Sequence, residues 1–143
     1  MISAMSEQAI DAAQGPADPE LQQRLDQSEA VIVGVVSSIS LFSPQRPGAE
    51  HDPGWQQATI EVESVEKGKA TTKTIPVLFA NSPDIAWSRS PKLKKGDRGI
   101  WLLQNRDPFG RAVPGLAVVN PADQQPIQEL AKIRTLLQNP AER

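Results

Sequence analysis

A continuous apolar run, Ile100 to Leu103, is the feature of this 143-residue sequence that most limits its fold. It follows the charged, glycine-containing segment Lys94 to Gly99 and has no polar alternation. A short strand with apolar side chains on both faces needs cover on both faces, so the run predicts a central strand. Trp101, the largest side chain in the run, is expected to be buried there. The rest of the chain is expected to pair with this strand or to cover it.

Four further segments have the composition or the alternation of β-strands. They are residues 30–42, 55–65, 74–79 and 111–119. Gly34 predicts a bulge in the first of them. Pro76 lacks an amide proton, so the third strand is expected at an edge or paired on one side at that point. Pro114 and Gly115 are expected to interrupt the last one.

A helix is predicted at each end of this β-rich region. Asp18 is expected to cap the first helix, with Pro19 in the first helical position and an end near Gln27. Asp123 is expected to cap the second helix. That helix carries an apolar stripe with steps of three and four residues, which predicts packing against the strands. The stripe consists of Ile127, Leu130, Ile133, Leu136 and Leu137.

The order of these elements predicts a mainly β fold. Five strands between a short N-terminal helix and a C-terminal amphipathic helix favour a five-stranded Greek-key barrel of the oligonucleotide/oligosaccharide-binding (OB) type. A β-sandwich is the alternative. Residues 1–17 are predicted to be a disordered lead, and residues 18–143 a single domain. The Pro- and Gly-rich residues 43–54 and the residues 80–93 are expected to be long loops.

Composition excludes some kinds of site. The chain has no cysteine, so it forms no disulfide and no thiolate metal site. Its formal net charge of −2 gives no overall attraction to nucleic acid or to an anionic membrane. No run approaches the roughly 20 apolar residues of a membrane span. Its N-terminal residues also lack the basic start and apolar core of a signal peptide.

Three segments resemble the strands of netrin-like domains, the group that includes the tissue inhibitors of metalloproteinases. The segments are AVIVGVVSSI (30–39), ATIEVESVEKG (58–68) and KKGDRGIWLL (94–103). The resemblance implies an OB-type barrel and a protein exported to the periplasm, with its leader ahead of Met1; a cytoplasmic protein is the alternative. The inhibitors chelate the protease zinc through an N-terminal cysteine. This chain has no cysteine, so that function does not transfer.

Few residues suggest catalysis or metal binding. Glu50-His51-Asp52 joins the chain's one histidine to two carboxylates, but three adjacent residues in a loop do not supply the convergent ligands of a zinc site. Gly68-Lys69-Ala70-Thr71 lacks the hydroxyl that a phosphate-binding loop needs after its lysine. Glu61 and Glu63 alternate with apolar residues and are expected to face solvent. The sequence therefore predicts a protein that is not an enzyme and uses no cofactor and no metal.

The segment from Trp87 to Arg98 is the strongest candidate for ligand binding. An aromatic residue beside clustered cations is typical of grooves that bind single-stranded nucleic acid. The alternative is a charged loop whose tryptophan packs onto the barrel, and Trp55 has the same two interpretations. The candidate ligand-binding residues are Trp55, Trp87, Arg89, Lys92, Lys94 and Lys95.

Two functions follow from these observations. The first is a non-catalytic binding or accessory module that contacts another protein or a component of the cell envelope. The second is a single-stranded nucleic-acid-binding protein that uses the segment from Trp87 to Arg98. The sequence leaves the oligomeric state open.

Overall fold

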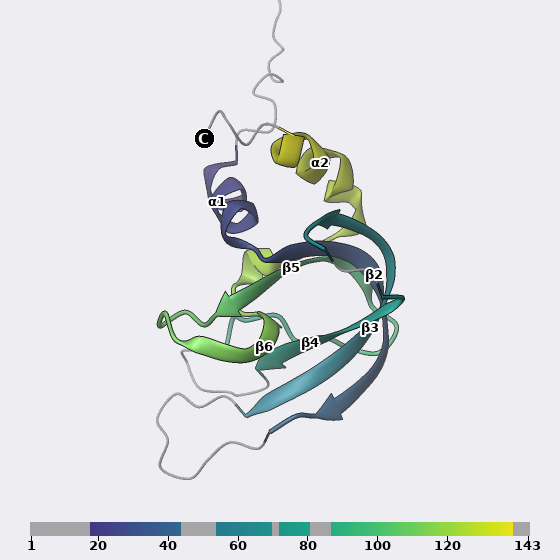
Figure 1. Ribbon diagram of the computed structural model, residues 1–143, viewed down its shortest axis with the longest axis vertical. Helices are drawn as coiled ribbons and strands as arrows, with labels where there is room; N and C mark the ends of the chain where they lie inside the picture. Colours follow the sequence, from purple (N-terminus) through teal and green to yellow (C-terminus); the bar gives the residue numbers. More distant parts are fainter. Residues whose placement is uncertain (1–17, 44–53, 70–71, 81–86, 139–143) are drawn as a thin grey trace, which may run out of the picture.

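The computed structural model describes residues 18–43, 54–69, 72–80 and 87–138. These residues form a mainly β fold, a mixed six-stranded sheet with a short helix before it and another after it (Figure 1). The predicted disordered lead, residues 1–17, lies outside the described residues, as do parts of both predicted loops.

Each of the five predicted strands is present, with bounds that differ from the predicted ones by no more than three residues. They are β2 (Ala30–Leu41), β3 (Trp55–Lys67), β4 (Thr74–Ala80), β5 (Arg98–Arg106) and β6 (Ala112–Val118), followed by the two-residue β7 (Gln124–Gln125). The helices are α1 (Pro19–Gln27) and α2 (Leu130–Gln138), with the short 3-10 turns η1 (Pro121–Asp123) and η2 (Ile127–Glu129) between β6 and α2.

Strand pairing makes β2 and β5 the centre of the sheet. The strand order is β2-β3-β4-β6-β5-β7, and β2 also pairs with β5. Ile32 on β2 therefore lies opposite Val65 of β3 on one side and Trp101 of β5 on the other. The β4–β6 pairing is parallel and the other pairings are antiparallel. The predicted central position of the Trp101 strand is confirmed.

Gly34 lies where the register between β2 and β3 shifts, as the predicted bulge requires. A Cβ atom at Gly34 would lie 2.2 Å from the carbonyl oxygen of Glu61, so another residue there would push β3 away. Pro76 pairs with Thr59 of β3, while β6 reaches β4 only at Leu78 and Phe79. The prediction that β4 is paired on one side at Pro76 is thus confirmed.

The prediction that Pro114 and Gly115 interrupt this strand is wrong, because β6 runs through both residues. The irregularity is in the pairing of β6 with β5 instead. Gln104 opposes Ala117 whereas Arg106 opposes Ala112, so the register with β5 shifts across this stretch. An unpaired stretch tolerates a proline because no ladder bond is lost.

Alternate residues of β5 pack into two different apolar clusters. Trp101 and Leu103 belong to the cluster enclosed by the strands, with side chains such as Ile32 and Phe79. Ile100 and Leu102 face the other way, into a cluster that contains residues of both helices. β5 is therefore covered on both faces, as its apolar run predicts.

Both helices lie over the outer face of β2 and β5 (Figure 1). As predicted, Asp18 caps α1, accepting a hydrogen bond from the amide of Leu21 at 3.1 Å. Leu21 and Leu25 of α1 are buried beside Ile133 and Leu136 of α2. The predicted packing of the apolar stripe of α2 is confirmed.

The predicted capping of the last helix by Asp123 is wrong. Asp123 lies in η1, seven residues before α2 begins at Leu130, and forms a capping box with Asn120. Its fully buried carboxylate also receives hydrogen bonds from the amide of Val119 and the side chains of Gln104 and Arg24. Asn120-Pro121 is itself an N-cap followed by a proline in the first position. The short turn η1 therefore begins at Pro121, before the residue that was predicted to cap the last helix.

Replacing Trp101 with alanine should lower the free energy of unfolding by about 3–5 kcal/mol, because a large core side chain is lost and a cavity remains. Val65→Ala is the control, because Val65 lies on β3, which β2 separates from β5, and is 36% exposed. Urea denaturation measures the free energy of unfolding of both variants. A loss for Trp101→Ala as small as that of the control would contradict the central position of β5.

Acid should weaken the attachment of α2 to β3. Glu66 of β3 accepts hydrogen bonds from Arg134 at 2.8 and 3.0 Å and from Ser64 at 2.7 Å. The Arg134 guanidinium, and then Ser64, hold the pKa of Glu66 below its usual 4.5. A carboxylate with a lowered folded pKa stabilises the protein above the unfolded value, and this contribution is lost as the pH falls through the folded value.

We therefore expect Glu66→Gln to be less stable than wild type near pH 6 and to lose less stability between about pH 6 and pH 3. Thermal melts at the two pH values measure this difference. Equal losses in the variant and in wild type would show that Glu66 contributes nothing to acid unfolding.

Candidate binding surface

The two candidate tryptophans lie together, and both are buried. Trp55 begins β3 and is 8% exposed, and Trp87 is fully buried. Their ring centroids are 5.4 Å apart, with an edge-to-face angle of 77°. Trp87 also meets the ring of Phe109 edge to face at 6.2 Å. The three rings form a row that ends at Phe109, which is 47% exposed.

This burial gives Trp87 a structural role in the conformation described. A nucleic-acid base stacks on an exposed aromatic face, and Trp87 offers none. Its aromatic edge-to-face contacts instead stabilise the end of the sheet. The exposed ring in the row belongs to Phe109.

Lys92 closes the turn that follows Trp87. Its Nζ atom donates to the carbonyl oxygen of Trp87 at 2.8 Å and contacts the Ser90 hydroxyl at 2.7 Å. The Ser90 hydroxyl donates to the same carbonyl at 2.7 Å. Burial lowers the pKa of Lys92 because it disfavours the charged form. Lys92 is therefore engaged within the chain.

Lys94 and Lys95 are exposed on a tight turn that is attached to β2. The amide of Lys94 donates to the Asp97 carboxylate at 2.9 Å, and Gly96 adopts a positive φ of 94°. The amide of Gly96 donates to the carbonyl of Val36, and the amide of Val36 donates to the carbonyl of Asp97. These bonds place the two lysines beside the middle of β2.

The two arginines of the segment from Trp87 to Arg98 lie in different surroundings. Arg89 is exposed, and Arg98 forms a 2.8 Å ion pair with Glu63. The guanidinium of Arg98 lowers the pKa of Glu63, and Glu63 raises that of Arg98. The structure thus joins Trp55 to Trp87 and Lys92 to the Trp87 turn. It places Lys94 and Lys95 on a different turn.

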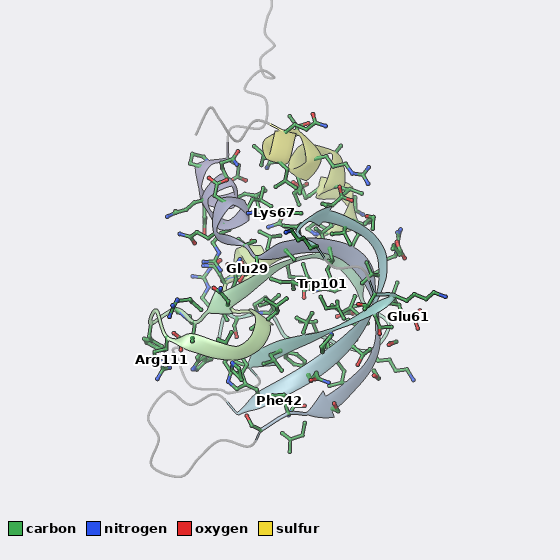
Figure 2. The ribbon with its side chains drawn as sticks, viewed as in Figure 1. Glu29, Phe42, Glu61, Lys67, Trp101 and Arg111 are labelled. Carbon is green, nitrogen blue, oxygen red and sulfur yellow. The ribbon has the colours of Figure 1, made fainter. Side chains whose placement is uncertain are left out.

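Large apolar side chains are exposed at the end of the sheet away from the helices. They are Leu41 (62%), Phe42 (47%) and Phe109 (47%), and we call this surface the aromatic end. The amide of Phe42 donates to the carbonyl of Trp55 at 2.9 Å, so Phe42 adjoins the row of rings. Figure 2 places Phe42 and Arg111 in the half of the molecule opposite the helices.

Arg111 adds one cation to the aromatic end. Its guanidinium carbon lies 4.9 Å from the centre of the Phe109 ring, and its Nε forms a 2.7 Å ion pair with Asp107. The Asp107 carboxylate also accepts hydrogen bonds from the amides of Phe109 and Arg111. The hairpin that presents Phe109 is therefore held by its own polar groups.

Phe42 and Phe109 were not among the residues predicted to bind a ligand. Both stand next to turn-forming residues, Phe42 before Ser43-Pro44 and Phe109 between Pro108 and Gly110. A large aromatic residue next to turn-forming residues lies outside the alternating core positions of a strand. This combination of residues would have identified both as exposed aromatic side chains.

A pocket of about 300 Å³ lies beside the start of β5. Its lining residues are Asp97, Arg98, Gly99, Trp101, Gln124, Gln125 and Pro126. Several of their polar atoms are already bonded within the chain. The indole nitrogen of Trp101 donates to Gln124 at 3.2 Å, and the Gln125 amide nitrogen donates to the carbonyl of Ala122 at 2.8 Å. Two of the polar groups that line the pocket are therefore engaged within the chain.

The candidate catalytic and metal groups do not converge in the described part of the chain. There, no group of three or more His, Cys, Asp or Glu residues is placed to hold a metal ion. The Glu50-His51-Asp52 segment lies outside the described residues. Glu61 and Glu63 are exposed, as predicted, and Glu61 points away from the sheet (Figure 2). None of the described helices is long and apolar enough to span a bilayer.

No protein-family model matches the chain, and no curated protein is significantly similar to it. The resemblance to netrin-like domains therefore stays a prediction.

Trp87 and Phe109 should respond differently to truncation. Trp87→Ala should lower the free energy of unfolding by about 3–5 kcal/mol, as for other large core aromatics. Phe109→Ala should cost less than about 1 kcal/mol, because its ring is half exposed. Chemical denaturation measures both. Equal and small losses would place Trp87 on the surface and restore it as a ligand-binding residue.

Proposed function

We propose that this protein is a non-catalytic binding module with an OB-type barrel, and that it binds another protein at the aromatic end. The barrel is supported by the pairing of the strands. Going from β2 through β3, β4, β6 and β5, the pairings return to β2. A cycle of five strands, with one parallel pairing between the third and the fifth, is consistent with this architecture.

The observation that carries the proposal is the exposure of large apolar side chains on two loops at the aromatic end. OB-type barrels bind ligands through the loop between their first two strands and the loop between their last two. In this chain, Phe42 begins the first of these connections and Phe109 lies in the second. The two connections therefore coincide with the exposed rings.

A protein partner suits this surface better than a polyanion does. Aromatic residues that sit on a rigid base are typical anchors of protein interfaces. Trp55 and Trp87 supply that base. Arg111 is already paired with Asp107, so it brings little unbalanced positive charge. Following the netrin-like resemblance, we place the partner in the cell envelope.

Single-stranded nucleic acid is the second candidate ligand. The observation in its favour is the Arg111 guanidinium over the exposed Phe109 ring, a pair on which a base can stack. Its binding would depend on Phe109 and Arg111 rather than on Trp87. Counterion release would make the affinity fall with salt, with a log–log slope of about −0.7 per phosphate contacted.

The proposal is tested by proximity crosslinking in the native cell with wild type, with a Phe42→Ser/Phe109→Ser double variant and with a Val65→Ser control. Val65 is an exposed apolar residue on β3, outside the aromatic end. We expect a partner that wild type and the control capture and that the double variant loses. Calorimetry with the purified partner then measures the same difference.

A titration with a mixed-sequence oligonucleotide at two salt concentrations tests the second candidate. Micromolar binding that falls with salt and is lost in Phe109→Ser would replace the protein partner by nucleic acid. A partner that the double variant captures as well as wild type does would contradict the proposed surface.

A further inference from the structure

Among the described residues, the last part of β2 is paired along one of its two edges only. Residues 30–35 of β2 pair with β3 on one side and with β5 on the other. Val36 is still bonded on the β5 side, through Gly96 and Asp97. A register shift follows between Val36 and Ser38. From Ser38 to Leu41 the described pairing is with β3 alone.

The hydrogen-bonding direction of each residue follows from the antiparallel ladder. The amide of Phe42 donates to the carbonyl of Trp55 on β3. Backbone groups alternate in direction along a strand, so Ser40 also faces β3. Ile39 and Leu41 must then direct their N–H and C=O groups to the opposite side. In the described part of the chain, no strand or turn pairs with them there.

This edge lacks the devices that usually protect an exposed strand. Natural edges are blocked by lysine, by proline or by inward-pointing charges, because an open edge pairs with other chains. The residues from Ser37 to Phe42 read Ser-Ser-Ile-Ser-Leu-Phe and contain neither a charge nor a proline. Ser38, Ser40 and Leu41 are exposed, and β2 ends away from the helices (Figure 1).

We infer that the Ser38–Leu41 edge of β2 pairs with the same edge of a second copy of this chain. The segment is self-complementary in an antiparallel arrangement about a twofold axis through Ser40. Ile39 then lies opposite Leu41 of the second copy, and Leu41 opposite Ile39. Both pairs point their free backbone groups at each other, as a hydrogen-bonded pair requires.

The side chains suit this register as well. Ile39 packs against the enclosed core, and Leu41 lies on the same face of β2. Each apolar residue therefore lies beside an apolar residue of the second copy. The two Ser40 residues meet on the other face, with Cα atoms about 4.5 Å apart, and small neutral side chains fit there. No like charges oppose each other.

The proposed interface is short, so we expect a weak dimer. It should form only at the highest protein concentrations in a sedimentation experiment. Sedimentation up to about 1 mM protein covers the weak end of specific association. Wild type should change from monomer toward dimer as the protein concentration rises.

Ser40→Lys should abolish dimerisation, because it places two lysines side by side at the twofold axis. Gln23→Lys is the control, because it adds the same charge at an exposed site on α1, and it should dimerise like wild type.

Leu41→Pro is a second variant that removes one outward N–H donor. The neighbouring residues Ser40 and Phe42 keep their bonds to β3, and an edge strand tolerates proline where its N–H faces solvent. It should also be monomeric. Its melting temperature should stay close to that of wild type. A dimer that survives both Ser40→Lys and Leu41→Pro would overturn the inference.

Amide hydrogen exchange of wild type tests the inference without any variant. At low concentration Ile39 and Leu41 should exchange fast and Ser40 slowly, and at high concentration all three should exchange slowly. Slow exchange of Ile39 and Leu41 at the lowest concentration would mean that the chain covers its own edge, and a monomer at every concentration would exclude the pairing. Both results would overturn the inference, and neither affects the proposed partner at Phe42 and Phe109.

Discussion

The buried carboxylate of Asp123 connects the parts of the fold that the sheet alone does not join. It forms a 2.8 Å ion pair with Arg24 of α1, a 3.2 Å hydrogen bond with Gln104 of β5, and a hydrogen bond with the backbone after β6. Leaving such a charge without partners is costly. The first helix, a central strand and the chain leading to α2 are therefore held in one arrangement. This connection holds α1, which shares an apolar cluster with α2, against the sheet.

The two helices cover one side of the sheet, and the proposed binding surface lies at the end away from them. The outer face of β2 and β5 is taken up by the two helices and their shared apolar cluster. At the opposite end, two tryptophans form a buried base beneath exposed Phe42 and Phe109. The base is rigid because its rings contact edge to face, and the Phe109 hairpin is held by Asp107. Exposed aromatic rings beside a buried base are the feature on which we base the proposed protein partner.

The sequence predicted those parts of the fold that depend on local patterns. The strands followed from alternation and apolar runs, the bulge from Gly34, and the cap of α1 from Asp18. Asp123 was misplaced because the local sequence offers an earlier N-cap at Asn120, and because the partners of its buried carboxylate, Arg24 and Gln104, are distant in sequence. For the second of these reasons, the sequence left two interpretations of Trp87 open, packing onto the barrel and binding of a ligand. Its contacts, Trp55 at the start of β3 and Phe109 between β5 and β6, are distant from it in sequence.

Hydroxyl-radical footprinting of the native protein tests most directly whether the aromatic end is an exposed surface on a buried base. The account predicts fast oxidation of Phe42 and Phe109. Trp55, Trp87 and Trp101 should be oxidised much more slowly than in the unfolded chain, although tryptophan is intrinsically the more reactive residue. Fast oxidation of Trp87, or protection of both phenylalanines in the monomer, would contradict the account.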